Sequence, residues 1–283
     1  MILIDFSQIM YAAVLQHLAT DKTAVLSVDL IRHMALNSLR FNVKKFKSTY
    51  GEVVIALDDK HYWRREVFPH YKASRKKTRD ASAFNWPEIF TCMDTLKNEL
   101  RTHAPYKVIQ VPGAEADDII GHLSQVYGPS QKIMVLSGDK DFVQLQTNKN
   151  VHQWSPLLKK EISDEFPALS LKQHIIRGDS GDGVPNILSP DDVFVSGGRQ
   201  KPIMEKKLID WLNKKPEDFC TSGDMLRNFR RNEMLIDLKN IPATLRQLIG
   251  HSFDTTVHAN RSQFMDYLAK SGLKELTSSV GDF

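Results

Sequence analysis

Short continuous apolar runs alternate with stretches in which apolar residues recur at helical spacing along the first two-thirds of the chain. The continuous runs predict buried strands over residues 2–6, 53–57, 107–111 and 133–136. The helical spacing predicts helices over residues 26–46, 86–103 and 115–127. Strands that alternate with helices in this way predict βαβ units and an α/β fold. The sheet is expected to be mostly parallel, with helices on both faces.

The pattern changes after about residue 165, where strand-like runs fade. Helical spacing continues near residues 170–177, 202–213, 223–238 and 242–250. Pro185, Pro190 and the pair Gly197-Gly198 interrupt the segments between them. This change predicts two domains, with the sheet in residues 1–167 and an all-helical region in residues 168–283.

The composition of the 283 residues is that of a globular protein, with 41% apolar and 25% charged residues. No run of about 18 apolar residues occurs, so no membrane span is predicted. Met1 leads directly into the first predicted strand, which leaves no room for a signal peptide. Cys92 and Cys220 lie far apart without metal-type spacing, which indicates reduced thiols and a cytoplasmic location.

Carboxylates gather in short patches, most of them just after a predicted strand. Asp5, Asp58 and Asp139 each follow a buried run, and parallel strands bring their carboxyl ends to one rim of the sheet. Carboxylates forced together repel one another unless they hold protons or hard cations. In a chain of net charge +4, such a set predicts bound Mg²⁺ or Mn²⁺. The predicted metal ligands are Asp5, Asp58, Glu115, Asp117, Asp118, Asp139, Asp141, Asp179 and Asp182.

Each acidic patch also has an ordinary structural explanation. A single aspartate at a strand end is usually a helix cap. Acids in the first turn of a helix, as at 115–118, are stabilised by the helix dipole. The acidic turns at 139–141 and 178–185 are each typical of surface turns. The repetition of acids after three strands favours the metal site, because mutual repulsion opposes a purely structural role.

A basic segment separates the second and third predicted strands. Within residues 60–80 the cations are opposed only by Glu66 and Asp80, and four aromatic residues interleave with them. Cations bind phosphates and aromatic rings stack on unpaired bases, although a solvated charged face above buried aromatics is the alternative. The predicted nucleic-acid contacts are Arg64, Arg65, Tyr71, Lys72, Arg75, Lys76 and Lys77.

Four motifs in order give the chain a family resemblance. They are Trp63-Arg64 with Phe68-Pro69 and Tyr71-Lys72-Ala73, Glu115-Ala116-Asp117-Asp118, Ser137-Gly138-Asp139-Lys140-Asp141-Phe142, and Gly178-Asp179 with Asp182. Together they resemble the flap endonuclease and 5′-nuclease family, which includes the 5′-nuclease domain of bacterial family A polymerases. Residues 3–9 and 153–156 look most like the ribonuclease H group of T-even bacteriophages within that family. The resemblance covers nearly the whole chain.

The resemblance implies a PIN-like nuclease domain, a helical arch over the active site and a C-terminal helical region that binds duplex DNA. By position, the first metal cluster matches Asp5, Asp58, Glu115, Asp117 and Asp139. The second matches Asp141, Asp179 and Asp182, with Asp118 beside them. Arg64, Tyr71, Lys72 and Arg75 match arch residues that contact the scissile phosphate and the 5′ strand. Lys72, Arg64 and Asp139 are the expected catalytic residues.

The chain departs from the family pattern after Asp182. Gly183 stands where the family usually has Asn, Asn186 stands where it has Gly, and residues 188–199 lack the Gly-x-Gly pattern. In the family this stretch forms a helix-hairpin-helix that binds duplex backbone, often with a monovalent cation. The divergent sequence still implies a duplex-binding region, and it leaves open whether a monovalent cation binds there.

The resemblance implies a 5′-3′ exonuclease and flap endonuclease that uses two Mg²⁺, for which Mn²⁺ can substitute. Such an enzyme would remove RNA primers, as ribonuclease H activity, and 5′ flaps during DNA replication. Its expected partners are branched or nicked DNA and RNA–DNA hybrids with a 5′ end. A monomer in the host cytoplasm is expected if the protein is phage-encoded. Residues 276–283 either dock a single-strand DNA-binding protein or sliding clamp, or form a frayed terminus, and the second is favoured.

Three alternatives remain. A Mg²⁺-dependent phosphatase of the haloacid dehalogenase type needs a second acid two positions after the first, where this chain has Ser7 after Asp5. A catalytically silent module that binds DNA structures is a second alternative. It is disfavoured because carboxylates that face DNA would weaken binding to the phosphate backbone. A PIN-class ribonuclease for single strands is the third. The basic segment and the helical C-terminal third disfavour it.

Overall fold

The computed structural model describes residues 1–20, 27–82 and 84–283. The chain forms two compact units, each assembled from segments that are discontinuous in sequence. Unit 1 comprises residues 1–60, 85–163 and 242–283, and unit 2 comprises residues 61–84 and 164–241. The predicted division into residues 1–167 and 168–283 stays a prediction, because compact units describe packing rather than the sequence modules of a family.

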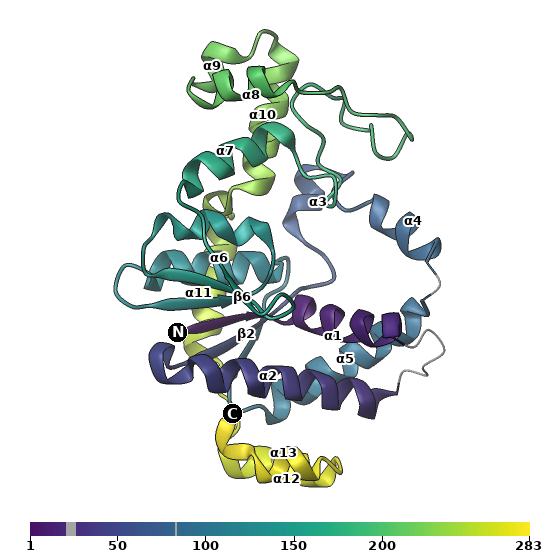
Figure 1. Ribbon diagram of the computed structural model, residues 1–283, viewed down its shortest axis with the longest axis vertical. Helices are drawn as coiled ribbons and strands as arrows, with labels where there is room; N and C mark the ends of the chain where they lie inside the picture. The colour runs from purple at the N-terminus through teal and green to yellow at the C-terminus, as the bar shows by residue number, and fades with distance from the viewer. Residues whose placement is uncertain (21–26, 83) are drawn as a thin grey trace. The chain divides into compact units, whose positions relative to one another are not determined.

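Unit 1 is built on a sheet that has six strands in the described part of the chain, in the order β3-β2-β1-β4-β5-β6. The strands are β1 (Ile2–Asp5), β2 (Val53–Leu57), β3 (Lys107–Gln110), β4 (Ile133–Leu136), β5 (Val151–Ser155) and β6 (Lys160–Ile162). Neighbours pair in parallel except β5 with β6, which are antiparallel. The predicted α/β fold with a mostly parallel sheet is therefore confirmed (Figure 1).

The burial of residues along each strand explains which strands could be predicted from the hydrophobic pattern. Every residue of β1, β2 and β4 is buried, as expected for central strands covered on both faces. In β5, buried and half-buried positions alternate, and two of the buried positions hold the polar residues Gln153 and Ser155. Because those positions are not apolar, the hydrophobic pattern did not predict β5 or its short partner β6.

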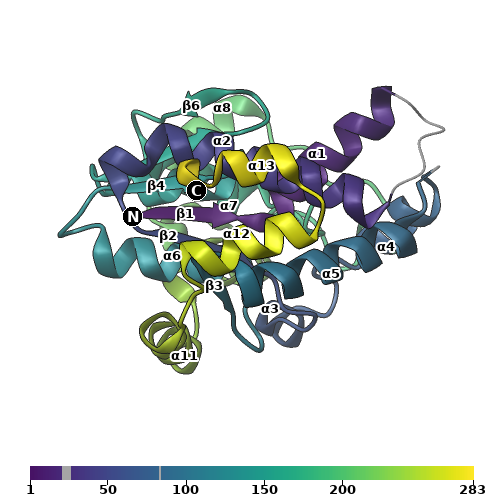
Figure 2. The same ribbon diagram turned by 90° about the horizontal axis from the view of Figure 1, so that it is seen from below.

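Helices surround the sheet of unit 1. They are α1 (Phe6–Thr20), α2 (Val28–Tyr50), α5 (Trp86–His103), α6 (Ala116–Tyr127), α11 (Ala243–Thr255), α12 (Arg261–Lys270) and α13 (Lys274–Ser278), with the 3₁₀ turns η1 (Lys140–Thr147) and η3 (Val280–Asp282). Figure 2 shows α2 and α6 on opposite sides of β1. The Ser27 side chain caps α2 by accepting from the Leu30 N–H at 3.2 Å, and Gly51 ends the helix at a positive φ of 78°.

The C-terminal tail packs onto unit 1. Phe283 is 1% exposed, and its ring meets the ring of Phe264 edge to face at a centroid distance of 4.9 Å. The Lys47 ammonium donates to the Phe283 carbonyl at 2.6 Å. The favoured expectation of a frayed terminus was therefore wrong, because the buried Phe283 ring anchors these residues. Docking of a partner by this tail stays a prediction.

Unit 2 is helical. Its elements are α3 (Trp63–Val67), α4 (Ser74–Asp80), α7 (Pro167–Arg177), α8 (Glu205–Leu212), α9 (Pro216–Phe219), α10 (Gly223–Ile236) and the 3₁₀ turn η2 (Leu238–Asn240). One apolar cluster holds it together and joins Phe68 and Tyr71 of the basic segment to Ile176 and Phe229 of the later helices. The predicted helical character of the chain after residue 165 is confirmed. None of the described helices is long and apolar enough to cross a membrane.

Candidate active site

Three aspartates meet at the carboxyl edge of the central strands of unit 1. Asp5 ends β1, Asp58 directly follows β2, and Asp139 follows β4 after the turn at 137–138. Because β1 lies between β2 and β4 in the sheet, the three side chains come from adjacent parallel strands. The structure therefore brings together the three residues that the strand-end pattern singled out.

The electrostatics of Asp5 show how crowded this edge is. Asp5 is 6% exposed, and burial raises its pKa to about 7, helped by the negative charges of Asp58 and Asp139. Hydrogen bonds from the Gln8 N–H at 3.2 Å and the Ser137 hydroxyl at 3.1 Å oppose this rise only in part. A buried carboxylate beside two others holds a proton near neutral pH, and a hard cation is the other way to neutralise it.

Neighbouring groups fix the other two aspartates. The Ser7 hydroxyl donates to Asp58 Oδ2 at 2.7 Å, and the Ala116 N–H donates to Asp58 Oδ1 at 2.9 Å. The first turn of α6 therefore lies against Asp58. Asp139 caps η1, because its Oδ1 accepts from the Asp141 N–H at 3.0 Å. Donors therefore orient both oxygens of Asp58 and one oxygen of Asp139.

Two of the acids at the start of α6 form its N-terminal capping box. Glu115 and Asp118 are buried, and the Glu115 N–H donates to Asp118 Oδ2 at 2.9 Å. Asp118 thus helps to cap the helix, which is the ordinary structural role for an acid at this position. Asp117 is half-buried in the same turn. The predicted metal roles of Glu115, Asp117 and Asp118 stay predictions.

Uncharged side chains that the sequence analysis missed hold the Asp139 turn in place. Gln153 is 1% exposed, and its amide donates to the carbonyls of Ser137 at 3.0 Å and Asp139 at 2.6 Å. Gln8 Oε1 accepts from the Ser137 hydroxyl at 3.0 Å and from the Gly138 N–H. The sequence signal for Gln153 is a polar residue at a buried position of β5. That position is recognised as buried only when the strand itself is known.

In unit 2, Asp182 lies among cations of the basic segment. It accepts from the Tyr71 hydroxyl at 2.9 Å and from Arg75 Nη2 at 2.5 Å, and Lys72 Nζ lies 3.6 Å away. The Lys72 N–H also donates to the Asp182 carbonyl at 2.7 Å, with Lys72 at a positive φ of 56°. A non-glycine residue held in this conformation needs strong local contacts. Asp182 therefore positions the residues around Lys72, whatever else it binds.

Asp179 belongs to the same loop of unit 2. Its Oδ2 lies 2.9 Å from His174 Nε2, and its Oδ1 accepts from the Asp182 N–H at 3.1 Å. Gly178 precedes it at a positive φ of 68°, where an added Cβ would lie 2.4 Å from the Val184 carbonyl oxygen. The predicted second cluster of Asp141, Asp179 and Asp182 stays a prediction.

The predicted nucleic-acid contacts differ in exposure. Arg64 is 2% exposed and donates through Nε to the Leu235 carbonyl at 2.8 Å, so a phosphate contact would require this anchor to break. Tyr71 is also buried, with its ring edge-on to that of Tyr62, so stacking on a base would require the ring to leave its site. Among the predicted contacts, the exposed cations are Arg65, Arg75, Lys76 and Lys77.

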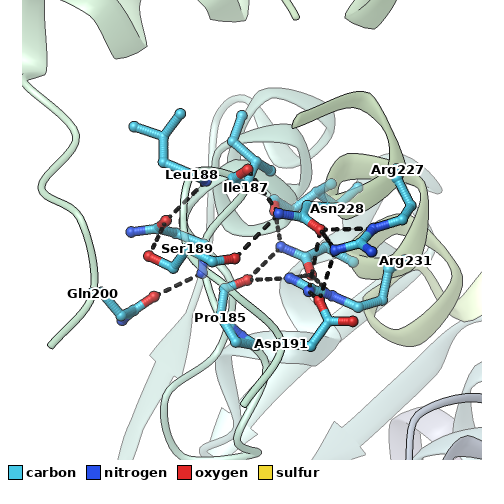
Figure 3. Close-up of polar contacts among 12 residues, drawn as sticks. Pro185, Ile187, Leu188, Ser189, Asp191, Gln200, Arg227, Asn228 and Arg231 are labelled. Atoms are coloured by element: carbon cyan, nitrogen blue, oxygen red, sulfur yellow. Dashed lines mark hydrogen bonds and ion pairs between the residues drawn. The ribbon is translucent and has the colours of Figure 1, made fainter. Parts of the chain in front are cut away.

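Side chains of α10 hold the loop that departs from the family pattern (Figure 3). The buried Asn228 amide donates to the carbonyls of Ile187 and Ser189, each at 3.1 Å. The Pro185 carbonyl accepts from Arg231 Nη2 and from the buried Asn232 amide, each at 2.8 Å. Three carbonyls of a loop without a glycine pattern therefore each have side-chain donors.

Comparison with known proteins assigns the class. Residues 1–173 match the family described as 5′-3′ exonuclease, N-terminal resolvase-like domain. Residues 166–283 match the family described as T4 RNase H, C terminal. The chain belongs to the 5′-3′ exonuclease family, which confirms the resemblance noted from the sequence motifs.

Particular relatives narrow this assignment. The ribonuclease H of Enterobacteria phage T4 is 32% identical over 292 residues, which cover 99% of this chain and 95% of that protein. A 5′-3′ exonuclease of Buchnera aphidicola subsp. Acyrthosiphon pisum (strain APS) is 29% identical over 194 residues, covering 66% of this chain and 65% of that protein. A solved complex of the bacteriophage T5 D15 flap endonuclease with DNA and metal ions shares the fold, with a TM-score of 0.64, 15% identity, and coverage of 89% of this chain and 96% of that chain.

Proposed function

We propose that the protein is a metal-dependent 5′-3′ exonuclease and flap endonuclease that hydrolyses phosphodiester bonds near 5′ ends. The observation that carries this proposal is the set of Asp5, Asp58 and Asp139 at one edge of the sheet, with the pKa of Asp5 raised to about 7. Family membership and the relatives from phages T4 and T5 support it. Removal of RNA primers and flaps in DNA replication is the matching biological role.

The donor set at this edge fits hard divalent cations. Every candidate donor there is a carboxylate oxygen, which suits Mg²⁺ or Mn²⁺ better than a softer metal. We propose two such cations. The first would be held by Asp5, Asp58, Glu115, Asp117 and Asp139, and the second by Asp141, Asp179 and Asp182, with Asp118 nearby. When bound, a cation pair of this kind lowers the pKa of a water and stabilises the leaving oxygen.

The chain's own residues prepare this chemistry. Ser7 and the Ala116 N–H orient Asp58, while Gln8 and Gln153 hold the turn that presents Asp139. The exposed cations Arg65, Arg75, Lys76 and Lys77 supply the charge that attracts a phosphate backbone. Lys72 and Arg64 are proposed to offset charge on the scissile phosphate, on the strength of the motif match alone.

Family membership supports a substrate with a 5′ end. Branched or nicked DNA and RNA–DNA hybrids with a 5′ end are the proposed substrates, and a single-strand DNA-binding protein or sliding clamp is a proposed partner. We propose that the protein acts as a monomer in the cytoplasm, which is the host cytoplasm if it is phage-encoded.

The structure of the divergent loop supports a proposal about the monovalent cation. Carbonyl oxygens that could face a cation, those of Pro185, Ile187 and Ser189, accept hydrogen bonds from Asn228, Asn232 and Arg231 instead. We propose that these donors hold the loop and that it needs no monovalent cation. DNA binding by this region should then depend on total salt rather than on the identity of the cation.

Asn232→Ala is expected to lower the free energy of unfolding by about 2–3 kcal/mol, because it leaves the buried Ile175 carbonyl without its Asn232 donor and weakens the contacts of Pro185. Urea unfolding measures this loss. Asn213→Ala is the matched control, since Asn213 is exposed and donates to a single helix carbonyl. Exchange of K⁺ for Na⁺ should leave the wild-type Tm unchanged, and stabilisation by K⁺ alone would contradict the cation-free loop.

The function is tested with 5′-labelled flap DNA and an RNA–DNA hybrid, each incubated with Mg²⁺, with Mn²⁺ or with chelator. Short 5′ products that appear only with metal are expected. Tight binding without cleavage under either metal would instead favour the silent DNA-binding module. Release of phosphate from a phosphate monoester, with no cut in the nucleic acid, would favour the phosphatase.

A further inference from the structure

A second candidate site lies in unit 1, in a groove of about 650 Å³ between α1, α2 and the turn that joins β5 to β6. A groove of this volume accommodates a nucleotide-sized ligand. Its apolar wall includes Phe41 of α2, which is 60% exposed, and Leu157 of the turn, which is 56% exposed. Exposed apolar side chains gathered in a concave site mark a binding surface more strongly than scattered ones do.

The charge of the groove selects the kind of ligand. Arg40 and Lys159 line it together with two histidines, and no Asp or Glu is among the described residues that line it. Lys159 is held at a positive φ of 52°, which fixes the course of the turn beside the groove. An aromatic ring and cations around an uncharged polar floor are the groups that bind the bases and phosphates of an unpaired strand.

Gln8 connects the groove to the acidic edge of the sheet. Gln8 lines the groove, and its N–H donates to Asp5 Oδ1 at 3.2 Å, while its Oε1 accepts from the Ser137 hydroxyl at 3.0 Å. A polyanion held in the groove therefore lies next to the carboxylates proposed to bind metal. This connection favours a nucleic-acid strand over an unrelated small molecule as the occupant of the groove.

We propose that this groove binds a single-stranded segment of the nucleic-acid substrate. Phe41 would stack on a base, and Arg40 and Lys159 would contact phosphates as the strand approaches or leaves the acidic edge. The inference rests on the proposed nuclease function and adds a binding subsite that the metal ligands do not provide.

Matched substitutions on the turn test the proposal. Lys159→Gln and Leu157→Ala alter the groove, whereas Lys160→Gln and Leu158→Ala change an adjacent lysine and an equally exposed leucine that do not line it. Phe41→Ala removes the ring. Fluorescence anisotropy in chelator measures Kd for a labelled duplex with a single-stranded arm and for the same duplex without it, and thermal melting checks that each variant folds.

For the armed substrate, Phe41→Ala is expected to weaken binding about tenfold. Lys159→Gln should reduce the slope of log K against log salt by about one, and Leu157→Ala should weaken binding a few-fold. Both control variants should bind like wild type. The proposal is overturned if groove and control variants behave alike, or if the groove variants weaken the armless duplex equally. A wild-type protein that cuts nothing with Mg²⁺ would refute the nuclease function instead.

Discussion

Asp5→Asn is expected to reduce Mg²⁺-dependent cleavage about a thousandfold, which corresponds to about 4 kcal/mol of transition-state stabilisation. Asp5 lies on the central strand of the three that contribute aspartates, and its carboxylate interacts with both Asp58 and Asp139. Asparagine keeps the shape of the side chain and removes its charge. The expected loss therefore reports weaker metal binding rather than a cavity in the core.

Single-turnover cleavage of 5′-labelled flap DNA at saturating enzyme measures this effect. Asp94→Asn on the exposed side of α5 is the control and should keep wild-type rates.

The cleavage rate of Asp182→Asn distinguishes a supporting role of Asp182 from a role as a metal ligand. If Asp182 mainly holds Lys72 and Arg75, the loss should be about 10–100-fold, the range for a residue that supports others. A loss as large as that of Asp5→Asn would favour its predicted role as a ligand. Near wild-type cleavage by Asp5→Asn would refute the metal assignment.

At pH 8 and without divalent metal, Asp5→Asn is expected to raise the free energy of unfolding by on the order of 3 kcal/mol. The pKa of Asp5 is raised to about 7 in the folded protein, whereas aspartate in an unfolded chain has a pKa of about 3.9. The folded protein thus holds this proton more tightly than the unfolded chain does. The wild-type protein loses that stabilisation as pH rises from about 4 to about 7, and asparagine does not.

Urea unfolding in chelator at pH 5 and pH 8 measures this difference. The advantage of the asparagine variant should be larger at pH 8 than at pH 5. Mg²⁺ should reverse the ranking at pH 8, because a cation bound only to the folded wild type stabilises it by mass action. An advantage that is equal at both pH values would show that the charge of Asp5 is not the cause.

The metal edge could be predicted from sequence because it follows from topology. Continuous apolar runs identify parallel strands, and parallel strands place Asp5, Asp58 and Asp139 at one edge. The groups that hold those aspartates could not be predicted. Gln8 and Ser137 are 129 residues apart, and no local pattern announces a hydrogen bond between them. Gln153 was hidden in addition, because its strand did not show apolar alternation.

The basic segment illustrates a second limit. Its charge and aromatic content predicted nucleic-acid contacts, and composition assigned the same role to every cation there. The structure separates them, because Arg64 is anchored on the Leu235 carbonyl whereas Arg75 is exposed. The burial of Arg64 depends on packing against α10, a helix about 160 residues later in the chain. The local sequence around Arg64 does not encode that packing.

The short strand β6 forms one edge of the sheet. It has three residues, pairs with no described strand other than β5, and exposes the charged side chains of Lys160 and Glu161. An edge strand that is this short and charged forms few backbone hydrogen bonds with a strand of a second molecule, and this protects against aggregation. Deleting the β5–β6 turn to close the groove would uncover β5 and remove that protection. Point substitutions are therefore the safer way to study the groove in concentrated protein.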